Sequence, residues 1–393
     1  MRSTLDYFHR FFFFLIFLCS STMRAQTDSS EKKIIRLNGY LKDLQSSLFV
    51  NRLDSNYLAS LIHNRLNCSL RFSKNFSGRI EMRNRIFYGE QIKMIPDFGK
   101  NINRYNGLFD LSTLWINKKS FVIHSVIDRI LLDYKTGSYH FTIGRQRINW
   151  GVSNIWNPND IFNTYNFLDF DYEERQGVDA VRAVKNFKNT LSMEIAYKPG
   201  KTKDDHIGGM LFKVNKFKYD LQMLGGIYRQ DAVLGIGWAG NIKDLGFKGE
   251  MNYFHPYQEK SMEKSSYNIS LMADRTFKNN WYGSVSFLYN SNPVNTSLGG
   301  NSLYSSNLSP KALFPFRNNF YAGVLKELSP ISNLNLAFIY SPENNTVILF
   351  PSITWNAANN LDIDLTAQAF FAESSKIYRM AATNIFLRGR FSF

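Results

Sequence analysis

The longest run dense in charged residues, tryptophan and asparagine covers residues 144–182. Its cations are Arg145, Arg147, Arg175 and Arg182, and its acids are Asp160, Asp169, Asp171, Glu173, Glu174 and Asp179. Opposite charges that line a narrow passage select solutes by their charge. The stretch is therefore a candidate constriction site. The alternative is a salt-bridged loop that only shapes a rim or helps folding.

Aromatic and turn residues indicate that this stretch is an ordered loop. Trp150 and Trp156 can pack it against a wall, and disordered segments are poor in such rings. The dipeptide Asn157-Pro158 favours a turn. A connection of about 25 residues is long enough to be functional. We therefore expect residues 146–177 to form a loop that folds inward.

The acidic residues of the stretch also have the chemistry of calcium ligands, because carboxylate oxygens bind that ion. The five carboxylates concerned are Asp160, Asp169, Asp171, Glu173 and Asp179. They lack the spacing and the turn glycine of an EF-hand, so no metal site is predicted and calcium stays an open alternative. Asp160 is also placed to cap a short helix through Ile161 and Phe162.

The sequence contains no recognisable catalytic motif. The six histidines are scattered along the sequence, and no nucleophile-elbow, zinc-binding or phosphate-loop motif accompanies them. The sequence therefore predicts no enzyme, no catalytic residue and no cofactor. The basic residues are dispersed among the expected strands of an exported chain, which argues against nucleic-acid binding.

Residues 1–25 have the pattern of a secretory signal peptide. Arg2 and Arg10 supply a basic region, a short apolar core follows, and small and polar residues lead to Ala25. The core is too short to span a bilayer, so we expect removal rather than anchoring. A lipid-modified Cys19 is the alternative. Loss of three arginines and one aspartate lowers the net charge from +15 to +13.

The mature chain, residues 26–393, has one cysteine, Cys68, so an intramolecular disulfide is impossible. No segment of it approaches 18 consecutive apolar residues, which argues against membrane-spanning helices. Two classes remain for an exported chain rich in aromatic residues. One is a secreted β-protein, and the other is an outer-membrane β-barrel, whose lipid-facing and lumen-facing residues alternate.

Period-2 alternation recurs along the mature chain. Apolar residues alternate with polar ones, many of them arginine, in residues 62–72 and 80–86, where Asn64 and Asn84 each interrupt the apolar face once. About 18 such segments follow one another without a linker, and bacterial barrels have even strand numbers. We predict one domain, an all-β antiparallel barrel of about 16 to 18 strands. Residues 290–314 are expected to form a long exposed loop.

The facing of two arginines is ambiguous. Arg145 and Arg147 have the same parity as Tyr139, Phe141 and Ile143, which are expected to face lipid. Either the strand leaves the lipid band at this point or a bulge resets its facing.

The last residues favour the barrel over a secreted β-protein. Residues 385–393 alternate apolar with polar or small residues and end on Phe391-Ser392-Phe393. A terminal aromatic residue after such alternation resembles the C-terminal assembly signal of bacterial outer-membrane barrels. This resemblance implies the barrel assembly machinery as a partner, read through Phe391 and Phe393.

Four motifs lie within the charged stretch. They are Gly144-Arg145-Gln146, Asn149-Trp150-Gly151, Trp156-Asn157-Pro158-Asn159-Asp160 and Gly177-Val178-Asp179-Ala180-Val181-Arg182. Together they resemble a recurring segment of porin-like outer-membrane barrel proteins, a broad group that includes relatives of alginate-export-type channels. The resemblance covers about 40 of 393 residues. It implies the barrel fold and specifies neither a substrate nor a catalytic residue.

A barrel of this width leaves an aqueous channel, and positive charge favours anions in pores. We therefore expect passive diffusion of small solutes, anionic ones or an anionic polymer among them, across the outer membrane of a Gram-negative bacterium. The alternatives are a non-transporting barrel that serves assembly or adhesion and, less favoured, a barrel hydrolase. The expected partners are outer-membrane lipid and the solutes, and the oligomeric state is open.

Overall fold

The computed structural model describes residues 34–50, 55–103, 105, 107–164, 176–187, 190–257, 264–293, 308–374 and 377–393. All described helices and strands lie in the second of the chain's two units, Ile35–Phe393. None of the described helices has the length and apolar character needed to cross a membrane.

The second unit is built from strands that follow one another along the chain. They are β1 (Ile35–Val50), β2 (Ser55–Arg71), β3 (Phe76–Gly89), β4 (Ser112–Lys118), β5 (Phe121–Thr136), β6 (Tyr139–Gln146), β7 (Val178–Asn186), β8 (Leu191–Lys198), β9 (Ile207–Lys216), β10 (Tyr219–Tyr228), β11 (Asp231–Ile242), β12 (Leu245–Pro256), β13 (Ser266–Phe277), β14 (Trp281–Asn290), β15 (Asn318–Ser329), β16 (Ser332–Ser341), β17 (Thr346–Ala358), β18 (Leu361–Ser374) and β19 (Ile377–Ser392). The helical turns are α2 (Glu90–Met94), α3 (Phe98–Ile102), η1 (Lys203–Asp205), η2 (Lys278–Asn280) and η3 (Pro342–Asn344).

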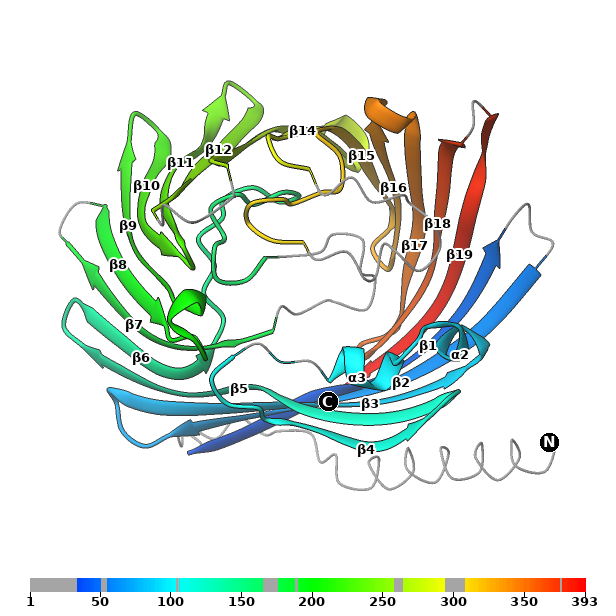
Figure 1. Ribbon diagram of the computed structural model, residues 1–393, viewed down its shortest axis with the longest axis horizontal. Coiled ribbons are helices and arrows are strands. Elements are labelled where there is room, and N and C mark those ends of the chain that lie inside the picture. The colour runs from blue at the N-terminus through cyan, green and yellow to red at the C-terminus, as the bar shows by residue number, and fades with distance from the viewer. Residues whose placement is uncertain are drawn as a thin grey trace. The chain divides into compact units, whose positions relative to one another are not determined.

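Eighteen of these strands form a closed ring (Figure 1). Each pairs antiparallel with its successor, except that β3 pairs directly with β5, and the pairing of β1 with β19 closes the ring. β4 pairs with β5 between Phe121 and Val126 and adds no strand to the circumference. The prediction of an all-β antiparallel barrel of about 16 to 18 strands is confirmed.

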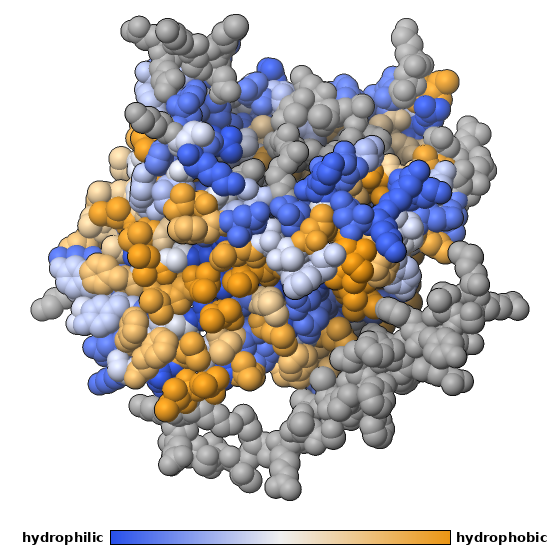
Figure 2. Space-filling view, turned by 60° about the horizontal axis from the view of Figure 1, so that its bottom comes forward, coloured by the Kyte–Doolittle hydropathy of each residue, from blue (hydrophilic) through white to orange (hydrophobic). Residues whose placement is uncertain are grey.

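Side chains alternate between the inside and the outside of the ring. On β6, Phe141 and Ile143 are exposed, whereas Thr142 between them is buried. Apolar side chains dominate the exposed positions of the strands, as a lipid-facing surface requires. Figure 2 shows apolar side chains gathered across one face of the protein, with many hydrophilic side chains above them.

The two asparagines that interrupt the apolar faces hydrogen-bond to each other. Asn64 and Asn84 are register partners on β2 and β3, and Asn84 Nδ2 donates to Asn64 Oδ1 at 3.2 Å. Asn64 Nδ2 donates to the carbonyl of Tyr40 at 3.2 Å, and the Ser125 hydroxyl donates to Asn84 Oδ1 at 2.7 Å. Because their polar atoms have partners, both amides are tolerated among apolar neighbours.

The facing of β6 changes at Gly144. Its φ is +113°, and both Arg145 and Gln146 after it are buried, whereas strict alternation would turn Arg145 outward. A Cβ at this position would lie 2.3 Å from the carbonyl oxygen of Ile130. Glycine is therefore required for both its conformation and its small size. The pairing of β6 with β5 and with β7 shows no register shift at this position, so the facing changes here without the bulge that was one of the two alternatives.

Two local predictions are wrong. Residues 157–164 contain turns and bends but no helix, so Asp160 caps none. In the described part of the expected exposed loop, Ala312, Leu313 and Phe314 are buried. The sequence around these apolar residues is polar and aperiodic, so it gave no sign that they would be buried. Their removal from water favours a path of the chain into the barrel.

The C-terminal strand closes the ring against the first strand. The Gly39 N–H donates to the Phe393 carbonyl at 2.9 Å, and the Phe393 N–H donates to the Gly39 carbonyl at 3.0 Å. Phe391 is the register partner of Leu41. Both terminal phenylalanines therefore lie at the seam between the first and last strands.

Candidate functional site

Two connections run inside the ring instead of leaving it. Residues 147–164 follow β6, and residues 308–317 precede β15; we call them the first and second inner segments (Figure 1). Most side chains of residues 155–163 are buried. The first inner segment is the described part of the inward-folded loop that the sequence predicted.

Glu250 on β12 anchors the middle of the first inner segment. Its Oε1 accepts the backbone N–H groups of Val152 and Ser153 at 2.6 and 2.7 Å, and its Oε2 accepts that of Asn159 at 3.0 Å. The side chain is fully buried. Hydrogen bonds to a charged group are about twice as strong as neutral ones. This one carboxylate therefore fixes two separate places of the segment.

Trp150 connects the first inner segment to a second wall carboxylate. Its Nε1 donates to Glu194 Oε1 on β8 at 2.6 Å. Arg182 on β7 contacts the same carboxylate, with Nε donating to Oε1 at 2.6 Å and a terminal nitrogen donating to Oε2 at 2.7 Å. From β10, Gln222 Nε2 donates to the Trp150 carbonyl at 2.7 Å. Trp150 is thus held at both its ring and its backbone.

Glycines in β11 make room for the side chain of Asn159. Asn159 Nδ2 donates to the carbonyl of Ile236 at 2.8 Å. A Cβ at Gly235 would lie 2.4 Å from Asn159 Oδ1, and one at Gly237 would lie 3.2 Å from Asn159 Nδ2. The two glycines therefore allow the asparagine to lie directly against the strand.

Apolar packing adds to these hydrogen bonds. Ile148, Trp150, Ile161 and Phe162 join one buried cluster with wall residues of β7 to β12. The rings of Trp150 and Phe162 meet edge to face, with centroids 4.8 Å apart. Burial of each such side chain contributes about 1.5–3 kcal/mol. The first inner segment is therefore part of the core rather than a surface loop.

Buried asparagines of the wall hold the second inner segment through its carbonyl groups. Asn268 donates to the carbonyl of Pro310 at 2.8 Å. Asn290 donates to the carbonyls of Phe314 and Phe316 at 3.1 and 2.7 Å. These bonds satisfy carbonyl groups that would otherwise be buried without partners.

The two inner segments also contact each other. Asn252 Nδ2 donates to the Pro158 carbonyl of the first segment at 2.5 Å and to the Pro310 carbonyl of the second at 3.3 Å. The Trp156 ring meets Phe314 edge to face, with centroids 6.0 Å apart. Trp156 and the Asn157-Pro158 turn are buried at this junction. The wall anchors described for both segments lie on β8 and on β10 to β15.

Arg145 and Asp179 form an ion pair that ties a third connection to the wall. Arg145 Nε lies 2.8 Å from Asp179 Oδ1, and Asp179 Oδ2 accepts the Tyr105 hydroxyl at 2.9 Å and the Phe109 N–H at 3.0 Å. The Arg145 guanidinium stacks over the Tyr105 ring, 4.0 Å from its centroid. Burial raises the pKa of Tyr105 above its ordinary range, so this phenol stays a proton donor.

A row of ionisable side chains crosses a different arc of the wall. Five consecutive register partners on β19, β1, β2, β3 and β5 are Arg390, Lys42, His63, Arg85 and His124. We call them the cationic row after its three permanent cations, Arg390, Lys42 and Arg85. They have the parity of the buried inner positions, while apolar residues such as Leu66 and Ile80 are exposed on the outside. The wall thus carries anchors for the inner segments on one arc and the cationic row on another.

The members of the cationic row differ in accessibility. Lys42, His63 and His124 are buried, whereas Arg85 and Arg390 are half-buried. A terminal nitrogen of Arg85 lies 3.2 Å from His124 Nδ1. The Arg390 guanidinium lies 4.7 Å from the centroid of the Tyr40 ring. The two arginines are therefore the members that a solute can reach most readily.

A buried ion cluster lies beside the cationic row. Arg65 contacts Glu81 at 2.5 Å and Asp128 at 2.8 Å, and Arg83 contacts Asp128 at 3.0 Å. Loss of one partner from such a cluster leaves a buried charge at a cost of about 3–5 kcal/mol. These acids balance part of the positive charge on the wall.

The structure brings some of the predicted site residues together and separates others. Arg145 pairs with Asp179, Arg182 contacts Glu194, Arg147 is exposed, and Asp160 is 1% exposed. Outside the described residues lie Asp169, Asp171, Glu173, Glu174 and Arg175. The ends of that gap are close, because Asn163 Nδ2 donates to the Gln176 carbonyl at 2.5 Å.

Three of the five calcium-ligand candidates fall in the same gap. Within the part of the chain that the structure describes, no group of three or more His, Cys, Asp or Glu side chains could hold a metal ion. Sequence reasoning did not identify Glu250 or Glu194 as anchors. Alternation places both on the inner face, but it carries no signal for which distant backbone groups they bind.

Comparisons with known proteins support the fold. No protein-family model and no curated protein matches the sequence. Similar solved structures include Acinetobacter baumannii OccAB2, with a TM-score of 0.59 and 8% identity over 92% of this chain and 99% of that one. OccAB4 from the same organism has a TM-score of 0.57 and 9% identity over 93% and 100%. Pseudomonas aeruginosa OpdK with vanillate has a TM-score of 0.57 and 7% identity over 91% and 98%. These proteins are outer-membrane porins, and the fold of this chain is a porin-like barrel.

Proposed function

We propose that this protein is an outer-membrane channel through which small solutes diffuse passively, with a preference for anions. A closed ring of 18 strands is wide enough to enclose an aqueous path. The cationic row carries the anion preference, because rings of Arg and Lys select anions in pores. The OpdK structure was determined with vanillate, a small carboxylate, which is the class of solute that this proposal favours.

The inner segments would narrow the path on one side. Their anchors lie on β8 and on β10 to β15, and the cationic row lies on β19, β1, β2, β3 and β5. A solute would therefore pass between the first inner segment and the half-buried Arg85 and Arg390. Contacts with the guanidinium groups would replace part of the hydration of an anion.

Seven of the charged residues of the sequence prediction keep their proposed role at this constriction, and three would act in another way. Arg147 and Arg182 would add positive charge along the first inner segment. The proposed acidic contribution comes from Asp169, Asp171, Glu173 and Glu174, beside Arg175. Arg145, Asp160 and Asp179 would act by holding the backbone, since their side chains are buried.

Reversal potentials across a planar bilayer test the proposal. Purified protein under a potassium chloride gradient should give stable open steps. Its reversal potential should have the sign of the chloride equilibrium potential. A reversal potential on the potassium side would contradict the anion preference. A lack of steps from protein shown by circular dichroism to be folded would contradict the channel.

One observation favours a second candidate, a sealed barrel that serves assembly or adhesion. Lys42 and Arg65 on the inner wall are 0% and 1% exposed, which is less than an open lumen would give. The conductance measurement separates the two candidates. We do not propose hydrolysis, because the sequence has no nucleophile-elbow or metal-binding motif that would support it.

A further inference from the structure

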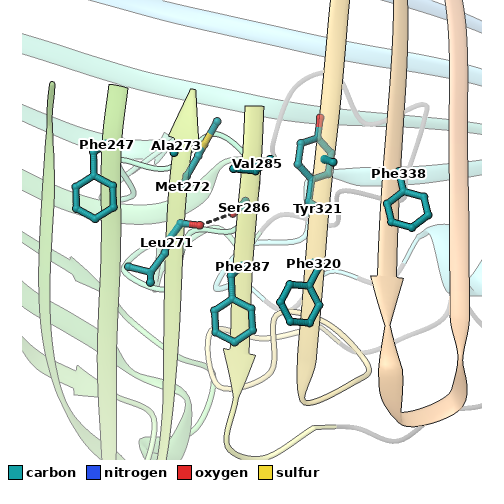
Figure 3. A pocket seen from close by; sticks show the side chains of 11 residues that line it. Phe247, Leu271, Met272, Ala273, Val285, Ser286, Phe287, Phe320, Tyr321 and Phe338 are labelled. Atoms are coloured by element: carbon teal, nitrogen blue, oxygen red, sulfur yellow. Dashed lines mark hydrogen bonds between the residues drawn. The ribbon is translucent and has the colours of Figure 1, made fainter. Parts of the chain in front are cut away.

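An apolar groove of about 430 Å³ lies on the outer surface of β12 to β16. Figure 3 shows it from close by, with the rings of Phe247 and Phe338 at its two sides. Ligand pockets range from about 300 to 1,000 Å³. The groove is therefore large enough for a flexible apolar chain.

Small residues form the floor of the groove. Phe247, Ala273, Val285, Ala322 and Phe338 are successive register partners across the five strands. The three central side chains are short, and the flanking rings stand higher. A single row thus gives the groove its floor and both of its sides.

One end of the groove is also closed. Leu271, Phe287 and Phe320 form the next row of register partners, and Figure 3 shows their side chains beside the floor row. The opposite end runs toward Gly283, which has no side chain, and Val324. The groove is therefore walled on three sides and opens toward the short turns that join the strands.

Two cations lie at the open end. Arg275 is two residues beyond Ala273 on the same face of β13, and its guanidinium lies 5.5 Å from the centroid of the Phe277 ring. Lys326 Nζ lies 5.3 Å from the centroid of the Trp281 ring. Arg275 also contacts Asp244 at 3.4 Å, with both side chains well exposed. An exposed pair of this kind is weak, so a phosphate group can compete for the arginine.

We propose that this groove binds one phospholipid of the periplasmic leaflet, with an acyl chain on the floor row and the phosphate at Arg275 and Lys326. The proposal rests on the proposed outer-membrane location, since short turns lie on the periplasmic side of such barrels. Aromatic residues mark the membrane interface. Phe277 and Trp281 therefore place the two cations at headgroup level and the floor row within the acyl region.

Charge distinguishes this occupant from a second copy of the chain. A second copy would cover the apolar floor with its own apolar face and would bring no phosphate to the two cations. A phospholipid satisfies both parts of the site with one molecule. Self-association is the competing outcome of the test.

Native mass spectrometry of the purified full-length barrel, after incubation with phosphatidylglycerol vesicles and return to detergent, tests the proposal. The wild type should retain one phosphatidylglycerol. Ala322→Phe fills the floor and should abolish retention, and Val285→Phe repeats the test on the neighbouring strand. Arg275→Gln and Lys326→Gln should each weaken retention about fivefold.

Val181→Phe is the matched control, because Val181 is an exposed outer residue on β7. It should retain lipid as the wild type does. Equal retention by Ala322→Phe and the wild type would overturn the proposal, as would a dimer mass that replaces the lipid adduct and is lost in Ala322→Phe. Conductance should be unchanged in Ala322→Phe. A wild type that retains lipid and gives no conductance would overturn the channel and leave the lipid site standing.

Discussion

Trp150 Nε1 donates a 2.6 Å hydrogen bond to Oε1 of Glu194. The tryptophan belongs to the first inner segment and the glutamate to β8, so the bond joins the candidate constriction to the wall. Arg182 donates to both oxygens of the same carboxylate. The position of the segment therefore depends on a small number of polar contacts whose removal can be measured.

We expect Trp150→Phe to loosen the first inner segment. The substitution removes the N–H that Glu194 accepts and keeps an aromatic ring in the cluster. A hydrogen bond to a charged group contributes about 1.5–3 kcal/mol, so the free energy of unfolding should fall by about that amount. Urea unfolding in lipid vesicles measures it.

Trp156→Phe is the control for ring size. Among the described residues, Trp156 Nε1 has no hydrogen-bond partner, so this change shrinks an equally buried ring without breaking such a bond. It should cost less than Trp150→Phe. Equal losses from the two variants would show that packing, and not the bond to Glu194, holds the segment.

Glu250→Gln should release the first inner segment at its middle. In one orientation of the new amide, its oxygen still accepts from Val152 and Ser153, and its nitrogen faces the N–H of Asn159. In the other orientation, the oxygen accepts from Asn159 and the nitrogen faces the other two N–H groups. A buried donor left without an acceptor costs about 1–3 kcal/mol. Hydrogen exchange should accelerate at the backbone amides of these three residues, and open steps should become larger or noisier.

Glu90→Gln, at an exposed position in α2, removes the same charge without touching either inner segment. Its exchange and conductance should match the wild type. Unchanged exchange at Asn159 in Glu250→Gln would refute the anchoring role.

Removing charge from the cationic row should reduce the anion preference of the channel. We expect Arg85→Gln and Arg390→Gln to move the reversal potential toward zero, and the double variant to move it further. A unit charge about 4 Å away is worth about 1 kcal/mol in water, so each change should lower the anion-to-cation permeability ratio at most about fivefold. Lys216→Gln, at the exposed last residue of β9, should leave the ratio unchanged; a similar loss there would point to net charge rather than to the row.

Gly144→Ala should destabilise the barrel, because its backbone lies at φ +113° and a Cβ would clash with the carbonyl oxygen of Ile130. Strained backbone of this kind costs about 1–3 kcal/mol before the clash is counted. Gly389→Ala is a matched control, since a Cβ there meets no atom within 4 Å. Urea unfolding should show a large loss for the first variant and almost none for the second.

Most of the ring could be predicted from the sequence because alternation is a local signal. The alternating residues 62–71 lie within β2 and residues 80–86 lie within β3, and the arginines mark the polar faces of both strands. A strand needs only its own residues to reveal its period. Adding such segments gives the approximate number of strands, and the rule for bacterial barrels makes that number even.

The inner segments could not be predicted in the same way. The bond between Val152 and Glu250 joins residues 98 positions apart, and no local pattern encodes it. The second inner segment is short and aperiodic, so its buried phenylalanines resembled loop residues. The cationic row required the strand register, which alternation alone leaves undetermined.

The seam between β1 and β19 has a consequence for how the chain can be connected. Gly39 and Phe393 hydrogen-bond to each other, so the two ends of the barrel unit meet at one place although nearly the whole sequence separates them. Long-range pairings of this kind form late, because the entropy of closing the chain must be overcome first. Because the two ends of the barrel unit are adjacent, the ring of strands does not depend on which strand comes first in the sequence. A circular permutant that joins these ends and opens at the short turn between β11 and β12 would retain every strand pair of the ring.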